Sequence, residues 1–164
     1  MTQFLDRYNT LLENIHPSME LMPDTTFEEI KEAGSIICYH SSDKEDLNPV
    51  RDGIHLGTKD QAVWRADYMV NDDQLFDEYN LHKVLLNVGR VYPDLIEDPG
   101  TDHGEEYKSE LSAEYDTLVY INKAEGDSSK HLNLSLIALN TSNIKAVKFD
   151  SVLTSDALDA YING

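Results

Sequence analysis

Short apolar runs separated by polar segments restrict the fold of this chain more than any other feature of its sequence. Such runs occupy residues 35–40, 53–57, 117–121, 132–139 and 144–149. Their length and their content of β-branched and aromatic side chains are typical of β-strands. Between them, Val84, Leu86 and Val88 alternate along residues 83–88 with the period of two that a strand requires. The sequence therefore predicts a protein whose C-terminal half is mainly β.

Helices are predicted from apolar spacing and from capping signals. Residues 3–15 place apolar side chains three and four positions apart, which predicts an amphipathic helix that ends before Pro17. A capping box pairs an N-cap Ser or Thr with a Glu or Gln three residues later. Thr25 with Glu28 fits this pattern and predicts a short helix over 26–33.

A second capping box, Thr58 with Gln61, predicts a helix directly after the strand at 53–57. Two more helices are expected towards the C-terminus. The helix capped by Thr58 is expected over residues 59–69. Of the other two, one is expected over residues 105–113, within the acidic stretch 94–116, and the last begins at a cap of Thr154 or Ser155 and ends at Gly164.

A chain of 164 residues without an internal repeat or a linker is expected to form one domain. The fold class that we predict is α+β. Within the single domain, residues 1–34 are expected to be an N-terminal helical element, residues 35–152 the core, and residues 153–164 a C-terminal helix.

The charge of the chain limits its partners. Acidic residues outnumber basic residues 31 to 13, which gives a formal charge of −18 at pH 7. This charge repels nucleic acid phosphates and anionic lipid, so a protein with a basic surface is the expected partner, with no direct nucleic acid and no membrane binding. A single cysteine, Cys38, excludes an internal disulfide, and no secretion signal is evident at the N-terminus. We expect a cytoplasmic location.

Common catalytic motifs do not occur in the sequence. It contains no GxxxxGK[ST], GxGxxG, HExxH or GxSxG pattern. The six histidines include no pair at i,i+4 spacing, and we predict no metal site. Cys38 lies in an apolar strand and is expected to be a buried structural thiol rather than a nucleophile.

Two segments in the first half of the chain share a recognisable pattern. Residues 38–42 read Cys-Tyr-His-Ser-Ser, so that a strand ends in His40 before small residues. Residues 53–58 read Gly-Ile-His-Leu-Gly-Thr and lead into a helix that contains Gln61, Ala62 and Arg65.

Matching segments follow in the second half. Residues 115–122 read Tyr-Asp-Thr-Leu-Val-Tyr-Ile-Asn and are followed by Glu125-Gly126 and, after another strand, by Ile144-Lys145. In order and spacing, residues 36–149 resemble the ADP-ribosyltransferase-like domains of many phage-encoded proteins. The resemblance implies a split β-sheet with flanking helices, and a protein that binds NAD as a substrate and modifies a host protein.

The resemblance also implies roles for individual residues. Breaking the nicotinamide–ribose bond of NAD develops positive charge on the ribose, which a carboxylate stabilises, and Glu125 is the candidate for this role. His40 and Ser41 would hold the ribose and the nicotinamide amide, and Tyr68 would stack on the ring. The helix that begins after Thr58, next to Gly57, would offer backbone N–H groups to a phosphate oxygen.

The sequence departs from the pattern at one chemically important position. Active transferases of this fold carry an acidic residue where this chain has Ser135. Two other functions therefore stay open. One is a non-catalytic acidic inhibitor that occupies a nucleic-acid-binding site on a host protein, and the other is a module that sequesters a nucleotide without turnover.

Structural interpretations also stay open for single residues. His40 can cap a strand, Thr58 is explained as a helix N-cap, and Glu125 is by default a solvated loop residue. Trp64 and Tyr68 lie four positions apart on one helix and are predicted to be packing residues.

Overall fold

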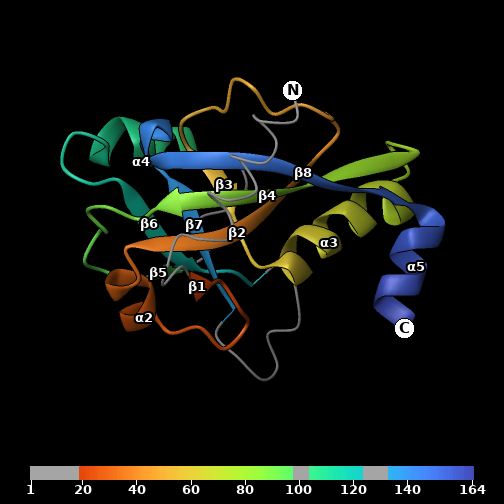
Figure 1. Ribbon diagram of the computed structural model, residues 1–164, viewed down its shortest axis with the longest axis horizontal. Helices are drawn as coiled ribbons and strands as arrows, with labels where there is room; N and C mark the ends of the chain where they lie inside the picture. The colour runs from red at the N-terminus through yellow and green to blue at the C-terminus, as the bar shows by residue number, and fades with distance from the viewer. Residues whose placement is uncertain (1–18, 98–103, 124–132) are drawn as a thin grey trace, which may run out of the picture.

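Two four-stranded β-sheets form the framework of the protein (Figure 1). The computed structural model describes residues 19–97, 104–123 and 133–164. The first sheet has the strand order β1 (Met19–Glu20), β2 (Ser35–Ser42), β4 (Glu78–Asn87) and β8 (Ile144–Thr154). The second sheet has the order β3 (Ile54–Leu56), β7 (Leu134–Ala138), β6 (Thr117–Ile121) and β5 (Ile96–Glu97).

Both sheets are mixed. Pairing is antiparallel between β2, β4 and β8 and between β3, β7 and β6, whereas β1 joins β2 and β5 joins β6 in parallel. Four α-helices complete the described part of the fold: α2 (Phe27–Glu32), α3 (Lys59–Asp67), α4 (Gly104–Leu111) and α5 (Ser155–Asn163). The predicted α+β class is confirmed.

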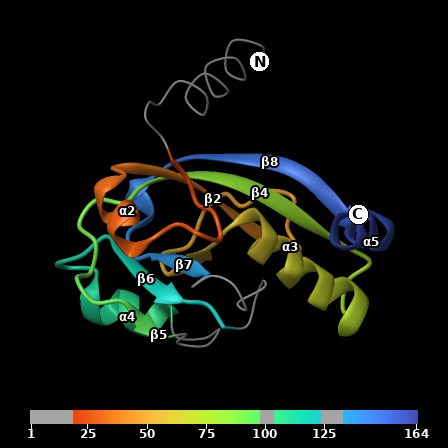
Figure 2. The ribbon, with the colours of Figure 1, turned by 90° about the horizontal axis from the view of Figure 1, so that it is seen from below.

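The helices lie at two ends of the sheets. Helices α3 and α5 lie at one end and α4 at the other, as Figures 1 and 2 both show. A π-helical turn, η1 (Tyr68–Asp72), extends α3, and a 3₁₀ turn, η2 (Thr141–Asn143), precedes β8. No helix in the described ranges is long and apolar enough to span a membrane.

The main hydrophobic core lies between the two sheets. It joins side chains of β2 and β4 to side chains of β3, β6 and β7. The fully buried members include Ile36, Cys38, Leu86, Val119 and Leu136. A second cluster packs α3 and α5 against the other face of the first sheet, through residues such as Tyr39, Val63, Leu81 and Leu158.

Strand β4 is buried on both of its faces. Val84 and Leu86 point into the core between the sheets, while Leu85 packs against Ala146 and Ile37 on the other side. The sequence suggested a period-two strand over 83–88, but β4 begins earlier, at Glu78, because it lies in the middle of the sheet between two long partners. Central strands become apolar on both faces when both faces are covered.

The start of α2 corrects the predicted cap. Thr26, not Thr25, is the N-cap: its hydroxyl accepts from the Glu29 backbone N, and the Glu29 side chain accepts from the Thr26 N. The Thr25 hydroxyl instead accepts from the backbone N of Met22. Either of the two adjacent threonines could have been the N-cap of α2. Thr25 instead closes the turn before α2, and Thr26 is left as the cap.

Residues 1–34 were predicted to be a helical element, but the described part, residues 19–34, contains a strand as well as a helix. Strand β1 is a strand that the sequence did not indicate, and Leu21 and Ile30 are buried in the core between the sheets. Residues 19–34 are therefore part of the core of the domain. The helix predicted over 3–15 lies outside the described residues.

Candidate functional site

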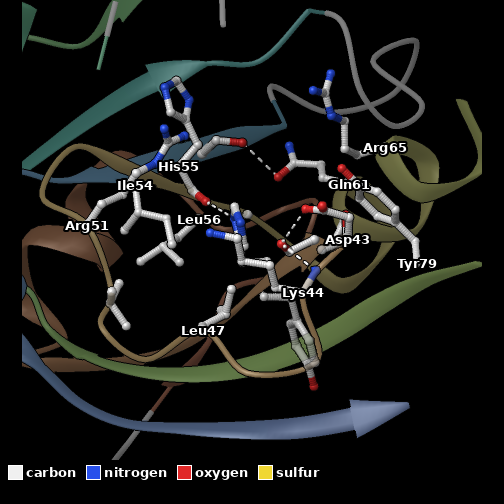
Figure 3. Close-up of a pocket in the computed structure, with 18 of the residues that line it drawn as sticks. Asp43, Lys44, Leu47, Arg51, Ile54, His55, Leu56, Gln61, Arg65 and Tyr79 are labelled. Carbon is white, nitrogen blue, oxygen red and sulfur yellow. Dashed lines mark hydrogen bonds between the residues drawn. The ribbon is translucent and has the colours of Figure 1, made fainter. Parts of the chain in front are cut away.

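A cavity of about 630 Å³ opens where the end of β2 meets β3 (Figure 3). The backbone N of Tyr39 donates to the Gly57 O at 2.8 Å, and the backbone N of Gly57 donates to the Tyr39 O at 2.9 Å. This bridge joins the first sheet to the second. The segment between the two strands, residues 43–52, forms one wall. The first turn of α3 and side chains of β6 and β7 complete the lining.

His40 lies in β2, two residues before its last residue Ser42, and lines the cavity with a fixed ring orientation. Its Nδ1 lies 2.8 Å from the backbone O of His55. Because a carbonyl only accepts, Nδ1 carries the hydrogen and Nε2 keeps a free lone pair. The pKa of His40 is lowered from 6.5 to about 4. Burial is the main cause, the bond to the His55 O opposes it, and the nearby His82 and Arg51 add to the lowering. The ring is therefore neutral at pH 7 and can accept a hydrogen bond from a ligand hydroxyl.

Ser41 follows His40 and also lines the cavity. It is 7% exposed, and its Oγ has no hydrogen-bond partner within the described residues. A buried hydroxyl without a partner costs stability, so such groups commonly mark a place where a ligand or water binds.

Gln61, at the start of α3, organises a buried polar network at the floor of the cavity. Its Oε1 accepts from the Thr58 backbone N at 2.9 Å and from the Ser135 Oγ at 2.7 Å. Ser135 in turn accepts from Asn122 Nδ2 at 3.1 Å, and Gln61 Nε2 donates to the Asn133 O. The Ser135 hydroxyl thus both donates and accepts within the protein. It is 1% exposed.

Gly57 makes room for this network. A Cβ at this position would overlap Gln61 Oε1 and would crowd the Gln61 Cβ at 3.2 Å. The absence of a side chain at Gly57 therefore lets Gln61 reach back to Thr58 and across to Ser135. Thr58 acts as the N-cap of α3, with its hydroxyl accepting from the Gln61 N at 3.1 Å, so the predicted capping box is confirmed.

The cavity gathers positive charge in an acidic protein. Three cations line it, Lys44, Arg51 and Arg65, against the carboxylates of Asp43 and Asp46. Figure 3 shows Arg51 and Arg65 on opposite sides of the cavity. A lining with more cations than carboxylates favours an anionic ligand, such as one that carries phosphate groups.

The wall formed by residues 43–52 is anchored at both ends. At its start, Asn80 Nδ2 donates to the Asp43 O at 3.2 Å, and the ring nitrogen Nε2 of His82 donates to the Lys44 O at 2.9 Å. At its end, the Asp52 carboxylate accepts from the Thr141 N at 2.8 Å, and this bond lowers the pKa of Asp52. Lys44 lies at the first of these fixed ends, and Arg51 directly precedes Asp52 at the second.

The structure brings together most of the residues that the sequence singled out. His40, Ser41, Gly57 and Ser135 all line the cavity. Thr58 is buried directly behind it as the cap of α3. Glu125, the predicted catalytic carboxylate, lies outside the described residues.

Tyr68 does not belong to the cavity, which corrects its predicted stacking role. It lies at the far end of α3, is 47% exposed and is not part of the lining. The prediction that Trp64 and Tyr68 are packing residues is also wrong, because Trp64 is 45% exposed. Helical spacing placed the two rings on one face, but the face of α3 that packs on the sheet carries Ala62, Val63 and Ala66.

The sequence assigned no binding role to several groups that complete the site, although all but Lys44 and Arg51 lie in the matched segments. Lys44, Arg51 and Arg65 supply its cations. Tyr120 lines it from β6, and Asn122 lines it from the position directly after β6. His55 also lines it, with Nδ1 2.9 Å from the Tyr120 hydroxyl. No local signal identifies Lys44 and Arg51, because residues 43–52 contain four acidic residues beside these two basic ones.

Cys38 is a buried thiol, as predicted. It lies in the core between the sheets, its Sγ contacts the Val84 O at 3.7 Å, and burial raises its pKa far above the ordinary value. Across residues 19–97, 104–123 and 133–164, no three His, Cys, Asp or Glu side chains come together to hold a metal ion.

Comparisons with protein-family models, with curated proteins and with solved structures found no match to this chain. Its function is therefore argued from the site itself.

Proposed function

We propose that this protein binds NAD in the cavity between β2 and β3. One observation carries the proposal: residues up to 95 positions apart, chosen from a sequence resemblance, line a single cavity. These residues are His40, Ser41, Gly57 and Ser135. The volume of about 630 Å³ lies within the range of small-molecule and cofactor sites.

Three features of the cavity support a dinucleotide as the ligand. The neutral ring of His40 offers an acceptor for a ribose hydroxyl. The Ser41 hydroxyl is free to donate or accept. Lys44, Arg51 and Arg65 supply positive charge for phosphate groups, for which arginine forks are well suited.

Transfer of ADP-ribose to a host protein is the reaction that we propose for this site. The bond between nicotinamide and ribose breaks, nicotinamide leaves with the bonding electrons, and a nucleophile of the acceptor protein bonds to the ribose carbon and loses its proton. The developing positive charge on the ribose needs a nearby carboxylate. In this proposal Glu125 supplies it.

Binding of NAD without turnover is the second candidate, and the Ser135 network favours it. A hydroxyl stays neutral at physiological pH and cannot stabilise positive charge as a carboxylate does. The Ser135 hydroxyl also donates to Gln61 and accepts from Asn122. A protein with this arrangement would sequester the nucleotide or act as a non-catalytic inhibitor.

Calorimetric titration with NAD tests the binding step. We expect saturable binding to the wild type, and at least tenfold weaker binding to Arg51→Gln, because a charged hydrogen bond contributes about 1.5–3 kcal/mol. His40→Ala should also bind more weakly. Lys145→Gln removes an equal charge outside the cavity and should bind like the wild type. An absence of NAD binding to the wild type would refute both candidate functions.

Labelled NAD and a host lysate then distinguish the two candidates. Label on a protein with the wild type and with Glu32→Gln, but not with Glu125→Gln, supports transfer with Glu125 as the acid. Glu32 is an exposed carboxylate at the end of α2 and is a matched control. Bound and intact NAD in all three samples, with no labelled protein, supports binding without turnover.

A further inference from the structure

An aromatic surface lies on the side of α3 that faces solvent. Trp64 and Tyr68, four positions apart, are 45% and 47% exposed, and Tyr161 of α5 is 41% exposed. We call these three residues the aromatic face. Large aromatic side chains are normally buried, so three exposed rings on two neighbouring helices are unusual for a surface with no partner.

Hydrogen bonds hold the two helices of this surface together. The Tyr161 hydroxyl donates to the Asp60 carboxylate in the first turn of α3. At the other end of α5, Ser155 Oγ donates to Asn71 Oδ1, and Asn71 Nδ2 donates to Asp67 Oδ1. The rings are therefore presented by a fixed pair of helices rather than by loops.

The surroundings of the aromatic face are acidic. Asp60 and Asp67 lie on the same side of α3 as Trp64, at spacings of four and three residues, and Asp72 follows in η1. The protein also seats one of its own cations there: the Lys59 ammonium lies 5.9 Å from the centre of the Tyr161 ring. Rings and carboxylates together attract cations, through the ring quadrupoles and through charge.

We propose that the aromatic face binds an arginine-rich segment of a partner protein. A guanidinium group stacks on aromatic rings and forms paired hydrogen bonds with carboxylates, and this face offers both. The net charge of −18 favours the same class of partner by attracting it from a distance. This inference does not rest on NAD binding, because no residue of the aromatic face lines the cavity.

Residues of α3 that neighbour the aromatic face also line the cavity. Gln61, Ala62 and Arg65 line the cavity, while Trp64 and Tyr68 face solvent from the same helix. Arg65 lies three positions before Tyr68 and Gln61 three positions before Trp64, so a segment bound to the aromatic face lies next to the edge of the candidate site. Figure 1 shows α3 and α5 together at this end of the molecule.

Trp64 is the only tryptophan in the chain, so its fluorescence reports binding at the aromatic face directly. The experiment titrates the full-length protein with an oligoarginine peptide, and with an oligolysine peptide of equal length. We expect a saturable change of Trp64 emission, with oligoarginine binding about threefold more tightly than oligolysine, because lysine lacks the planar stacking group. No saturable change with oligoarginine would overturn the proposal.

Variants separate this surface from general attraction between opposite charges. Tyr68→Ser should weaken oligoarginine binding about three- to fivefold. The double variant Asp67→Asn and Asp72→Asn should weaken it more than Glu32→Gln with Glu114→Gln, which removes the same charge elsewhere. Equal losses in the two double variants would show non-specific attraction and overturn the proposal.

A second copy of this chain is the other possible occupant. Sedimentation of the protein alone over a range of concentrations tests it. A monomer at all concentrations supports a separate partner. Self-association that Trp64→Ser abolishes would assign the aromatic face to a homodimer and overturn the proposal.

Discussion

His40 illustrates how a single residue acquires its properties from the fold. The sequence predicted a strand that ends at His40, and β2 continues two residues further, to Ser42. The charge of His40 could not be predicted. Burial lowers its pKa to about 4, and the bond from Nδ1 to the His55 O sets which nitrogen keeps the lone pair. Both effects depend on β3, which lies next to β2 only in the folded chain.

The low pKa of His40 predicts a loss of stability in acid. The unfolded chain, with an ordinary histidine pKa near 6.5, takes up a proton before the folded protein does. The contribution of the neutral His40 ring to the free energy of unfolding is fully present above pH 6.5. It is lost as the pH falls from 6.5 through 4. Its full size is on the order of 3 kcal/mol. Urea unfolding at a series of pH values measures it.

The variant His40→Asn is the control for this pH dependence. Asn keeps a donor for the His55 carbonyl but does not titrate. We expect the free energy of unfolding of the variant to fall less than that of the wild type between pH 6.5 and 4. Parallel curves for the two proteins would contradict a buried neutral His40.

Ser135 shows what the sequence could and could not tell about the site. Sequence reasoning identified the position and noted that it lacks an acid. It did not predict that the hydroxyl would be bonded to Gln61 and Asn122, which lie 74 and 13 positions away in the chain. The chemistry of the residue therefore depends on contacts that have no local signal.

At the scale of elements, α3 was predicted well because its signals are local. The strand at 53–57, the glycine and the capping box Thr58–Gln61 are consecutive in the sequence, and the structure contains β3, Gly57 and the capped helix in this order. A cap depends only on residues within one turn, so it can be predicted from the sequence without knowledge of the tertiary fold.

The cap of α3 leads to a stability prediction. Thr58→Ala should lower the free energy of unfolding by about 1–2 kcal/mol, because the Gln61 N loses its acceptor in a buried place. Thr58→Ser keeps a hydroxyl and should lose much less. Chemical denaturation of the three proteins measures the difference.

Thr154→Ala is the comparison for this prediction. Thr154 caps α5 through the Ala157 N, but Leu158 is the only buried residue of that helix. We expect a loss near 0.5 kcal/mol, at the low end for N-caps. Equal losses of unfolding free energy in Thr154→Ala and Thr58→Ala would show that burial of the α3 cap does not increase its contribution to stability.

Elements whose signals depend on distant partners were predicted less well. Strand β1 is two residues long, and its pairing with β2 has no pattern in the sequence. The exposed side of α3 was assigned to packing because Trp64 and Tyr68 lie four positions apart on one helix. Instead, the small residues Ala62 and Ala66 pack against the sheet, and their size allows the helix to lie close to β2.

At the scale of the whole molecule, charge is distributed unevenly. The chain carries −18, yet the cavity lining holds three cations and two carboxylates. The acidic surface repels anionic ligands at long range, while the cavity attracts them at short range. An anionic ligand therefore binds against the field of the protein as a whole and must be held by contacts within the cavity.

The net charge predicts that salt stabilises the fold. Raising the ionic strength from near zero to about 0.15 M screens the repulsion between acidic groups over a Debye length of about 8 Å. We expect the midpoint of thermal unfolding to rise over this range. An unchanged or lower midpoint would mean that attractive ion pairs, such as Arg90 with Asp116, outweigh the general repulsion.

The sequence by itself determined the α+β class, the positions of most strands, the capped start of α3 and the buried state of Cys38. Each of these follows from apolar periodicity or from neighbours within a few residues. Only the tertiary structure decided that β4 is covered on both faces, that Lys44, Arg51 and Arg65 share one cavity, and that Trp64 and Tyr68 face solvent. These features arise because packing brings together residues that are far apart in the chain, and no local pattern encodes which of them meet.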